Sequence, residues 1–179
     1  MSRRLFTVLA AGAAVLLFVP SALGARVHVR VEGKTQTIYG AAEPSVIVKV
    51  NALDALESAS LAGEFYYHVA TSAFGSYVDQ IGRYPAGGSS GWVFKVNGVS
   101  PPVGADAVVL KAGDRVLWYW ATFGSAGGPP TLLLERKKRS CYRVLAQDDK
   151  GKTSAARGAL LLVDGRSVRA RTGSACVGR

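Results

Sequence analysis

The chain has 179 residues and a formal net charge of +10, from 22 Lys and Arg against 12 Asp and Glu. The 155 residues that follow the first 24 suit one domain of ordinary size, or one domain with a small appendage. They hold no second apolar span, which argues against an integral membrane protein.

The first 24 residues have the pattern of an export signal peptide. Arg3 and Arg4 form a short positive region, and an apolar stretch of 15 residues follows at 5–19. Pro20 ends this stretch, and residues 22–24 supply small residues where a signal peptidase reads. A membrane anchor is the alternative, but about 20 apolar residues are needed to span a bilayer. We therefore expect a secreted or extracytoplasmic protein that is associated with the cell surface.

Residues 25–123, the N-terminal unit, begin with strand patterns. Val27, Val29 and Val31 alternate with polar residues, which is typical of a half-buried strand. A turn and a short hairpin partner follow, and the β-branched run at 45–50 predicts a third strand.

The period then becomes helical over residues 51–60. Asn51 is a good N-cap, and Asp54 lies near the positive end of the expected helix. Gly63 is expected to end it as the first residue beyond the C-cap. This is the one helix that the sequence of the mature chain predicts.

Strand patterns return after the helix. Residues 92–96 alternate, Asn97-Gly98 is a strong hairpin turn, and strands are expected at 107–110 and 115–123. Strands, one helix and more strands predict an α+β class. The expected fold is a β-grasp-like mixed sheet with one crossing helix.

Composition changes near residues 124–130, a Gly- and Pro-rich segment that has the character of a linker. From residue 25 to 130 there are eight basic and eight acidic residues, whereas 131–179 holds twelve basic and four acidic ones, a net of +8. Residues 131–179, the C-terminal unit, read as three or so strands, a small all-β appendage with a thin core.

Two cysteines, Cys141 and Cys176, bracket most of the C-terminal unit. An even cysteine count in an exported chain predicts a disulfide, which would stabilise this thin core by about 3–4 kcal/mol. Two unrelated buried thiols are the alternative.

Several segments together resemble the transcobalamin-like C-terminal domain family. They are VHVRVEG, NALDALESA, YVDQIG and the long stretch GWVFKVNG…GADAVVLKAGDRVLWYW. The resemblance covers about residues 26–123 and implies a β-grasp-type module, found in many exported bacterial proteins of unestablished function. In transcobalamin and intrinsic factor such a module closes over cobalamin, with a large helical domain that has no counterpart in this sequence.

The aromatic residues of two neighbouring strands are the candidate ligand site: Trp92, Trp118, Tyr119 and Trp120. Trp118 and Trp120 are expected on one strand face and Tyr119 on the other. A flat aromatic surface could bind a corrin, a sugar or a peptide. The alternative is ordinary core packing, which is favoured for Trp92 and its neighbour Phe94.

The basic residues of the C-terminal unit are the second candidate site: Arg136, Lys137, Lys138, Arg139, Arg169 and Arg171. Arg169 and Arg171 are expected on one face of the last strand. Clustered positive charge could retain the protein on an anionic envelope polymer or membrane surface. The alternative is a solvated face. No aromatic residue interleaves the arginines, so specific nucleic-acid binding is not expected.

No catalytic constellation and no metal site are expected. His28 and His68 have no partners at metal-ligand spacing. The segment AQDDKGKT at 146–153 loosely resembles a phosphate-binding loop, but its two aspartates and the β-like residues after it indicate a β-turn.

The sequence therefore favours a non-enzymatic exported binding or surface-interaction module without a cofactor. A small-molecule carrier, with cobalamin as candidate ligand, is the alternative. A hydrolase is the third class considered, with the two histidines and scattered carboxylates as its only bases. Oligomeric state is left open.

Overall fold

The computed structural model describes residues 24–72, 75–125 and 127–177. The predicted signal peptide, apart from Gly24, lies outside the described residues. Within the described ranges, no helix is long and apolar enough to cross a membrane.

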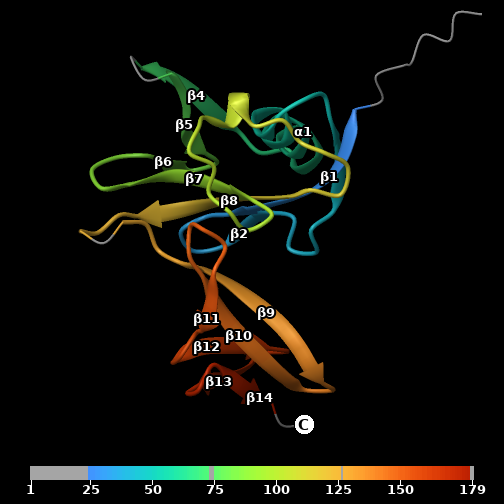
Figure 1. Ribbon diagram of the computed structural model, residues 1–179, viewed down its shortest axis with the longest axis vertical. Coiled ribbons are helices and arrows are strands. Elements are labelled where there is room, and N and C mark those ends of the chain that lie inside the picture. Colours follow the sequence, from blue (N-terminus) through green and yellow to red (C-terminus); the bar gives the residue numbers. More distant parts are fainter. Residues whose placement is uncertain (1–23, 73–74, 126, 178–179) are drawn as a thin grey trace, which may run out of the picture.

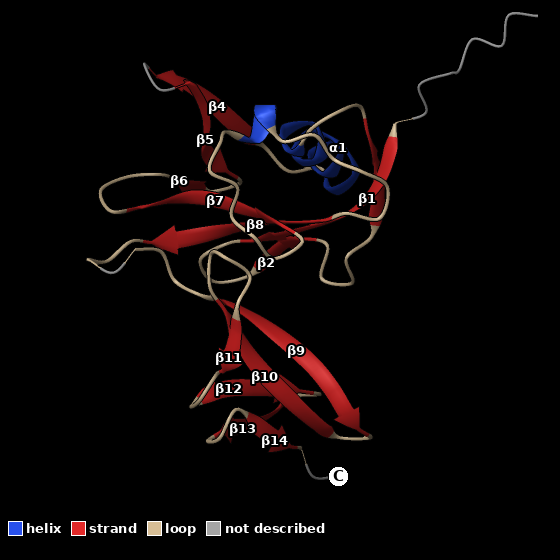
Figure 2. Cartoon of the chain, viewed as in Figure 1, coloured by secondary structure: helices blue, strands red, loops and turns tan. Residues whose placement is uncertain are grey.

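The fold is mostly β, and the predicted α+β class is wrong. The described residues form fourteen strands, one α-helix of 12 residues and one short 3-10 helix. The strands belong to four separate sheets, and Figure 2 shows how little of the chain is helical. One mixed sheet crossed by a helix is therefore not the architecture. A short helix covers part of one sheet only, and residues 67–85 and 131–176 add further sheets.

The largest sheet, called the main sheet below, has five strands in the order β2-β1-β8-β7, with β3 pairing with β1. β1 and β8 run parallel, and the other pairs are antiparallel. The five strands are β1 (Ala25–Glu32), β2 (Thr37–Tyr39), β3 (Ser45–Val48), β7 (Ser90–Val96) and β8 (Arg115–Thr122). The expected alternation in β1 is present, because Val27, Val29 and Val31 are fully buried.

Helix α1 (Ala52–Gly63) packs on the valine face of the main sheet and begins where the sequence predicts. The Asp54 N–H donates to Asn51 Oδ1 at 2.9 Å, and the Asn51 N–H donates to Asp54 Oδ2 at 3.1 Å, which makes a capping box. The predicted role of Gly63 as C′ residue is wrong: Gly63 is still helical and Glu64 takes the left-handed conformation, with φ of 51°. A Cβ on Gly63 would lie 2.5 Å from the ring of Tyr39, so close packing requires this glycine.

A three-stranded antiparallel sheet stands beside the helix (Figure 1). Its strands are β4 (Tyr67–Ser72), β5 (Gly75–Ile81) and β6 (Tyr84–Pro85). The strand predicted at 107–110 is absent. A 3-10 helix, η1 (Ala105–Ala107), stands there, and the next residues cap α1: the Ala52 N–H donates to Val108 O at 3.1 Å.

The C-terminal unit has its own small core and six strands rather than the three or so expected. Four form one sheet and two form a hairpin. The strands are β9 (Thr131–Lys138), β10 (Cys141–Gln147), β11 (Thr153–Ala155), β12 (Ala159–Val163), β13 (Arg166–Ala170) and β14 (Ser174–Cys176). The predicted disulfide between Cys141 and Cys176 is confirmed, and it joins β10 to β14 at directly paired positions.

Candidate ligand-binding site

Four aromatic side chains form two cross-strand pairs on the helix-facing side of β7 and β8. Trp92 pairs with Trp120, and Phe94 pairs with Trp118. The Phe94 and Trp118 rings stack with centroids 5.0 Å apart, and the Trp92 and Trp120 rings meet edge to face at 5.6 Å. Such pairs contribute about 0.5–1.5 kcal/mol beyond the area they bury. Trp118 and Trp120 thus share a face, and Tyr119, paired with Val93, lies on the other.

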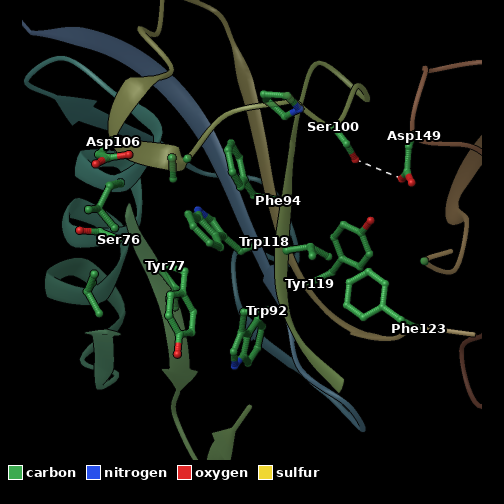
Figure 3. Close-up of a pocket in the computed structure, with 18 residues that line it drawn as sticks. Ser76, Tyr77, Trp92, Phe94, Ser100, Asp106, Trp118, Tyr119, Phe123 and Asp149 are labelled. Atoms are coloured by element: carbon green, nitrogen blue, oxygen red, sulfur yellow. Dashed lines mark hydrogen bonds between the residues drawn. The ribbon is translucent and has the colours of Figure 1, made fainter. Parts of the chain in front are cut away.

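A cavity of about 260 Å³ lies beside these rings, and Figure 3 shows its lining. Its walls come from β5, β7, β8, the loop at 100–106 and the C-terminal unit. Three of the four predicted ligand-binding residues line it: Trp92, Trp118 and Tyr119. Trp120 does not. It borders a second, wider cleft of about 960 Å³ under the main sheet, between the sheet and β9.

Two indole nitrogens of this cluster have no hydrogen-bond partner among the described residues. The Trp92 N–H donates to Tyr84 O at 2.8 Å, but Trp118 Nε1 and Trp120 Nε1 are buried and unpaired. A buried donor without an acceptor costs about 1–3 kcal/mol, and native structures hold few of them. Trp118 is only 2% exposed and lines the cavity, so a small movement of its ring would let a bound acceptor relieve this cost.

Lys95 lies on the opposite face of β7 and joins the two units. Its side chain is 0% exposed, and its ammonium donates to Thr131 Oγ1 at 3.2 Å, Gln147 O at 3.1 Å and Asp148 O at 2.9 Å. An ammonium has three protons, and each finds an oxygen here. All three acceptors belong to the C-terminal unit, which is therefore docked on the main sheet by a buried, fully bonded lysine.

The turn that Lys95 holds forms part of the cavity wall. Asp149 lines the cavity, and its Oδ1 lies 3.5 Å from Lys95 Nζ. Ser100 fixes the same residue, because its N–H donates to Asp149 O at 2.8 Å and its hydroxyl donates to Asp149 Oδ1 at 3.1 Å. Burial, followed by the nearby Asp149 charge, raises the pKa of the neighbouring Tyr119 phenol. The cavity is thus shared by both units.

The segment that holds most of this site is similar to a known domain family. Residues 50–122 match the family model described as a domain of unknown function, DUF4430. The match includes α1, β4 to β8 and the aromatic cluster, whereas Asp149 and the rest of the C-terminal unit lie outside it.

The other comparisons add little. No curated protein is significantly similar to the chain. Among solved structures, it is similar to one described as a "putative metal binding protein" from Ruminococcus gnavus ATCC 29149. The two are 14% identical, with a TM-score of 0.39, over 54% of this chain and 95% of that chain. Among the described residues, no three His, Cys, Asp or Glu side chains group as a metal site would require.

The predicted surface-binding basic residues lie in two places, and all are exposed. Arg136, Lys137 and Lys138 end β9, and Arg139 is in the turn to β10, at the end of the unit far from the N-terminal unit (Figure 1). Arg169 is on β13, and its guanidinium donates to Gly158 O at 3.0 Å. Arg171 is the first residue after β13, so it lies outside the strand on which it was expected beside Arg169.

Some of this positive charge is locally paired. Lys137 Nζ lies 3.0 Å from Glu135 Oε2, and Arg136 donates to Arg139 O at 2.9 Å. Exposed pairs of this kind contribute little to stability, so the side chains can reorient toward an anionic surface.

The two histidines do not line the aromatic cavity, whereas the phosphate-loop-like segment contributes Asp149 to its wall. His28 Nδ1 is 2.8 Å from Glu43 O, and His68 Nδ1 is 2.7 Å from Asp79 Oδ1. The segment 146–153 ends β10 and turns into β11, as the β-turn interpretation predicts. Its unexpected role is to present Asp148 and Asp149 to the N-terminal unit.

Sequence reasoning missed Lys95, Ser100, Asp106 and Asp149. The alternation in residues 92–96 places Lys95 opposite Trp92 and Phe94, but a polar residue on the outer face of a strand is normally solvated. Nothing local indicates burial, because its backbone acceptors are 52 and 53 residues away.

Proposed function

We propose that the protein is a non-enzymatic, extracytoplasmic binding protein and that the aromatic cavity is its ligand site. The observation that carries this proposal is the shared cavity with the unpaired, buried indole N–H of Trp118 in its wall. Ligand sites favour the junction between structural units, and they combine apolar walls with a few polar groups. The disulfide is consistent with an oxidising compartment.

The size of the cavity limits the ligand. Pockets that enclose a drug-sized molecule measure roughly 300–1,000 Å³, whereas this one measures about 260 Å³. A compact ligand, or a small part of a larger one, therefore fits best.

Cobalamin is the second candidate ligand, and its support is the resemblance of residues 26–123 to transcobalamin-like C-terminal domains. A corrin is too large for this cavity, so the chain would cover one part of cobalamin rather than enclose it. A second protein or a second copy would then supply the remaining surface.

Proton–nitrogen correlation NMR of the chain tests the ligand site, since the three indole N–H signals report on it directly. The probes are cobalamin, choline and the uncharged carbon isostere of choline, which carries a tert-butyl group in place of trimethylammonium. We expect a saturable shift of the Trp118 signal, assigned from its absence in Trp118→Phe, with at least one probe. Unchanged indole signals with all three would reject the cavity as a ligand site.

A second function, retention on an anionic surface, is favoured by the exposed basic residues at the far end of the C-terminal unit. The unit has a net charge of +8, from twelve basic and four acidic residues. We expect binding to phosphatidylglycerol vesicles or to immobilised poly(glycerol phosphate) to fall steeply with added salt. At a fixed salt concentration, changing Arg136, Lys137, Lys138 and Arg139 to Ala should weaken binding to these surfaces. If binding is unaffected by added salt and by these substitutions, the basic residues are not an electrostatic anchor.

A further inference from the structure

The charge of the cavity is opposite to that of the chain. The protein has 22 Lys and Arg, yet the described residues that line the cavity include no Lys, Arg or His. Among the described lining residues, the charged ones are Asp106 and Asp149. The local field therefore disfavours anions, although the whole molecule attracts them.

Six aromatic side chains line the cavity together with these two carboxylates. Figure 3 shows them: Tyr77, Trp92, Phe94, Trp118, Tyr119 and Phe123. The face of an aromatic ring carries negative charge density, and it attracts substituted ammonium groups more than it attracts anions. Rings from several directions and a carboxylate, with no cation among the described lining residues, are the features that such groups require. The nearby Lys95, whose Nζ lies 3.5 Å from Asp149 Oδ1, does not itself line the cavity.

We propose that this cavity binds a small organic cation, a compact substituted ammonium with a hydrogen-bond acceptor beside it. This inference rests on the proposed function, because it names the ligand class of the same site. A volume of about 260 Å³ suits a group of this size.

Asp106 is the carboxylate available to such a ligand. Asp149 Oδ1 is already engaged by the Ser100 hydroxyl at 3.1 Å and by Lys95 Nζ at 3.5 Å, so its charge is largely compensated. Asp106 is exposed on η1 and forms no ion pair with any residue that the structure describes. The two carboxylates flank the aromatic rings from opposite sides in Figure 3.

The unpaired Trp118 N–H is the reason that we expect a hydrogen-bond acceptor in the ligand. The indole nitrogen lies at the edge of the ring turned toward the side of Asp106 (Figure 3). A small movement of the ring would let it donate to a ligand oxygen, which supplies the missing partner. Choline combines a trimethylammonium group with such an oxygen, so it is a suitable probe.

Three probes of nearly identical shape separate charge from fit: choline, its uncharged carbon isostere, and the anion tert-butylacetate. Titration of the full chain, followed through the Trp118 indole signal, should show choline binding about tenfold more tightly than the isostere. Tert-butylacetate should bind most weakly. Asp106→Asn should remove most of the advantage of choline and leave binding of the isostere unchanged.

The matched control is Asp164→Asn, which makes the same charge change on an exposed turn of the C-terminal unit. It should leave all three affinities unchanged. Equal affinity for choline and its isostere would overturn the cation proposal, while the cavity would remain a ligand site. Loss of choline binding in both variants would assign the preference to overall charge rather than to Asp106. No saturable shift with any probe would overturn the ligand site itself.

Discussion

Lys95 Nζ lies 3.5 Å from Asp149 Oδ1, and this contact joins strand β7 of the main sheet to the β10–β11 turn of the C-terminal unit. Lys95 is fully buried, whereas the Asp149 side chain is 54% exposed. The lysine holds the turn mainly through two backbone carbonyls, those of Gln147 and Asp148. Asp149 lines the cavity and belongs to the turn that Lys95 holds. Lys95 therefore affects both the docking of the C-terminal unit and the shape of the proposed site.

Replacing Lys95 by Met should destabilise the protein strongly. The methionine fills most of the space but donates no hydrogen bond, so the carbonyls of Gln147 and Asp148 lose their buried donor. We expect a loss on the order of 2–5 kcal/mol in the free energy of unfolding, measured by denaturant titration. Lys150→Met, an exposed change on the same turn, is the control and should have little effect. Equal midpoints for the two variants would show that the Lys95 bonds do not stabilise the docked state.

Removing the disulfide should destabilise the C-terminal unit. The bridge joins residues 35 apart in the chain, and its unit has a small core of its own. Cys141→Ser with Cys176→Ser should cost about 2–5 kcal/mol. Thermal unfolding with and without a reducing agent measures this: the reductant should lower the midpoint of the natural protein and leave that of the double variant unchanged. A reductant-insensitive natural protein would contradict the prediction.

Local patterns predicted the elements whose structure depends on neighbours in the sequence. The valine alternation in β1 and the Asn51 and Asp54 cap were recognisable because period and capping act over a few residues. The disulfide could be predicted from the even number of cysteines and the expected export of the chain. The positions of Trp118 and Trp120 on one strand face followed from the strand period of two.

The number of sheets and the cavity could not be predicted in the same way. No local pattern in the sequence shows that β4 to β6 pair as a separate sheet. The cavity depends on contacts between Ser100 and Asp149, which are 49 residues apart. The sequence of a turn shows where the chain reverses direction. Which distant residues the turn then contacts is determined by tertiary packing.

Removing the N-cap of α1 should destabilise the protein moderately. Asn51→Ala leaves the Asp54 N–H without its side-chain acceptor. Such substitutions typically cost about 0.5–2 kcal/mol. Denaturant titration should show this loss, and Leu61→Ala, an exposed change in the same helix, should shift stability by less than about 0.5 kcal/mol. An equal response of the two variants would mean that the capping box does not stabilise the helix.

The Tyr67 phenol should lose its proton only at strongly alkaline pH, and this makes the stability of the fold depend on pH in that range. Burial and the hydrogen bond that Tyr67 donates to Glu57 raise the pKa of its phenol from the usual 10.0 to about 12. The neutral phenol is therefore favoured in the folded state. Its contribution to stability is complete below pH 10 and is lost as the pH rises toward 12. The contact also ties β4 to α1, beside the aromatic cavity.

Glu57→Gln tests this assignment, since it removes the negative charge but keeps the shape of the acceptor. The pKa of Tyr67 should fall toward its ordinary value without reaching it, because burial, the largest cause, remains. Ultraviolet titration of tyrosinate measures the shift, and comparison with Tyr67→Phe assigns it to this residue among the seven tyrosines. Glu64→Gln, which makes the same charge change at the exposed end of α1, should leave the curve unchanged. If Glu57→Gln and the natural protein titrate identically, Glu57 does not hold the Tyr67 phenol in its neutral form.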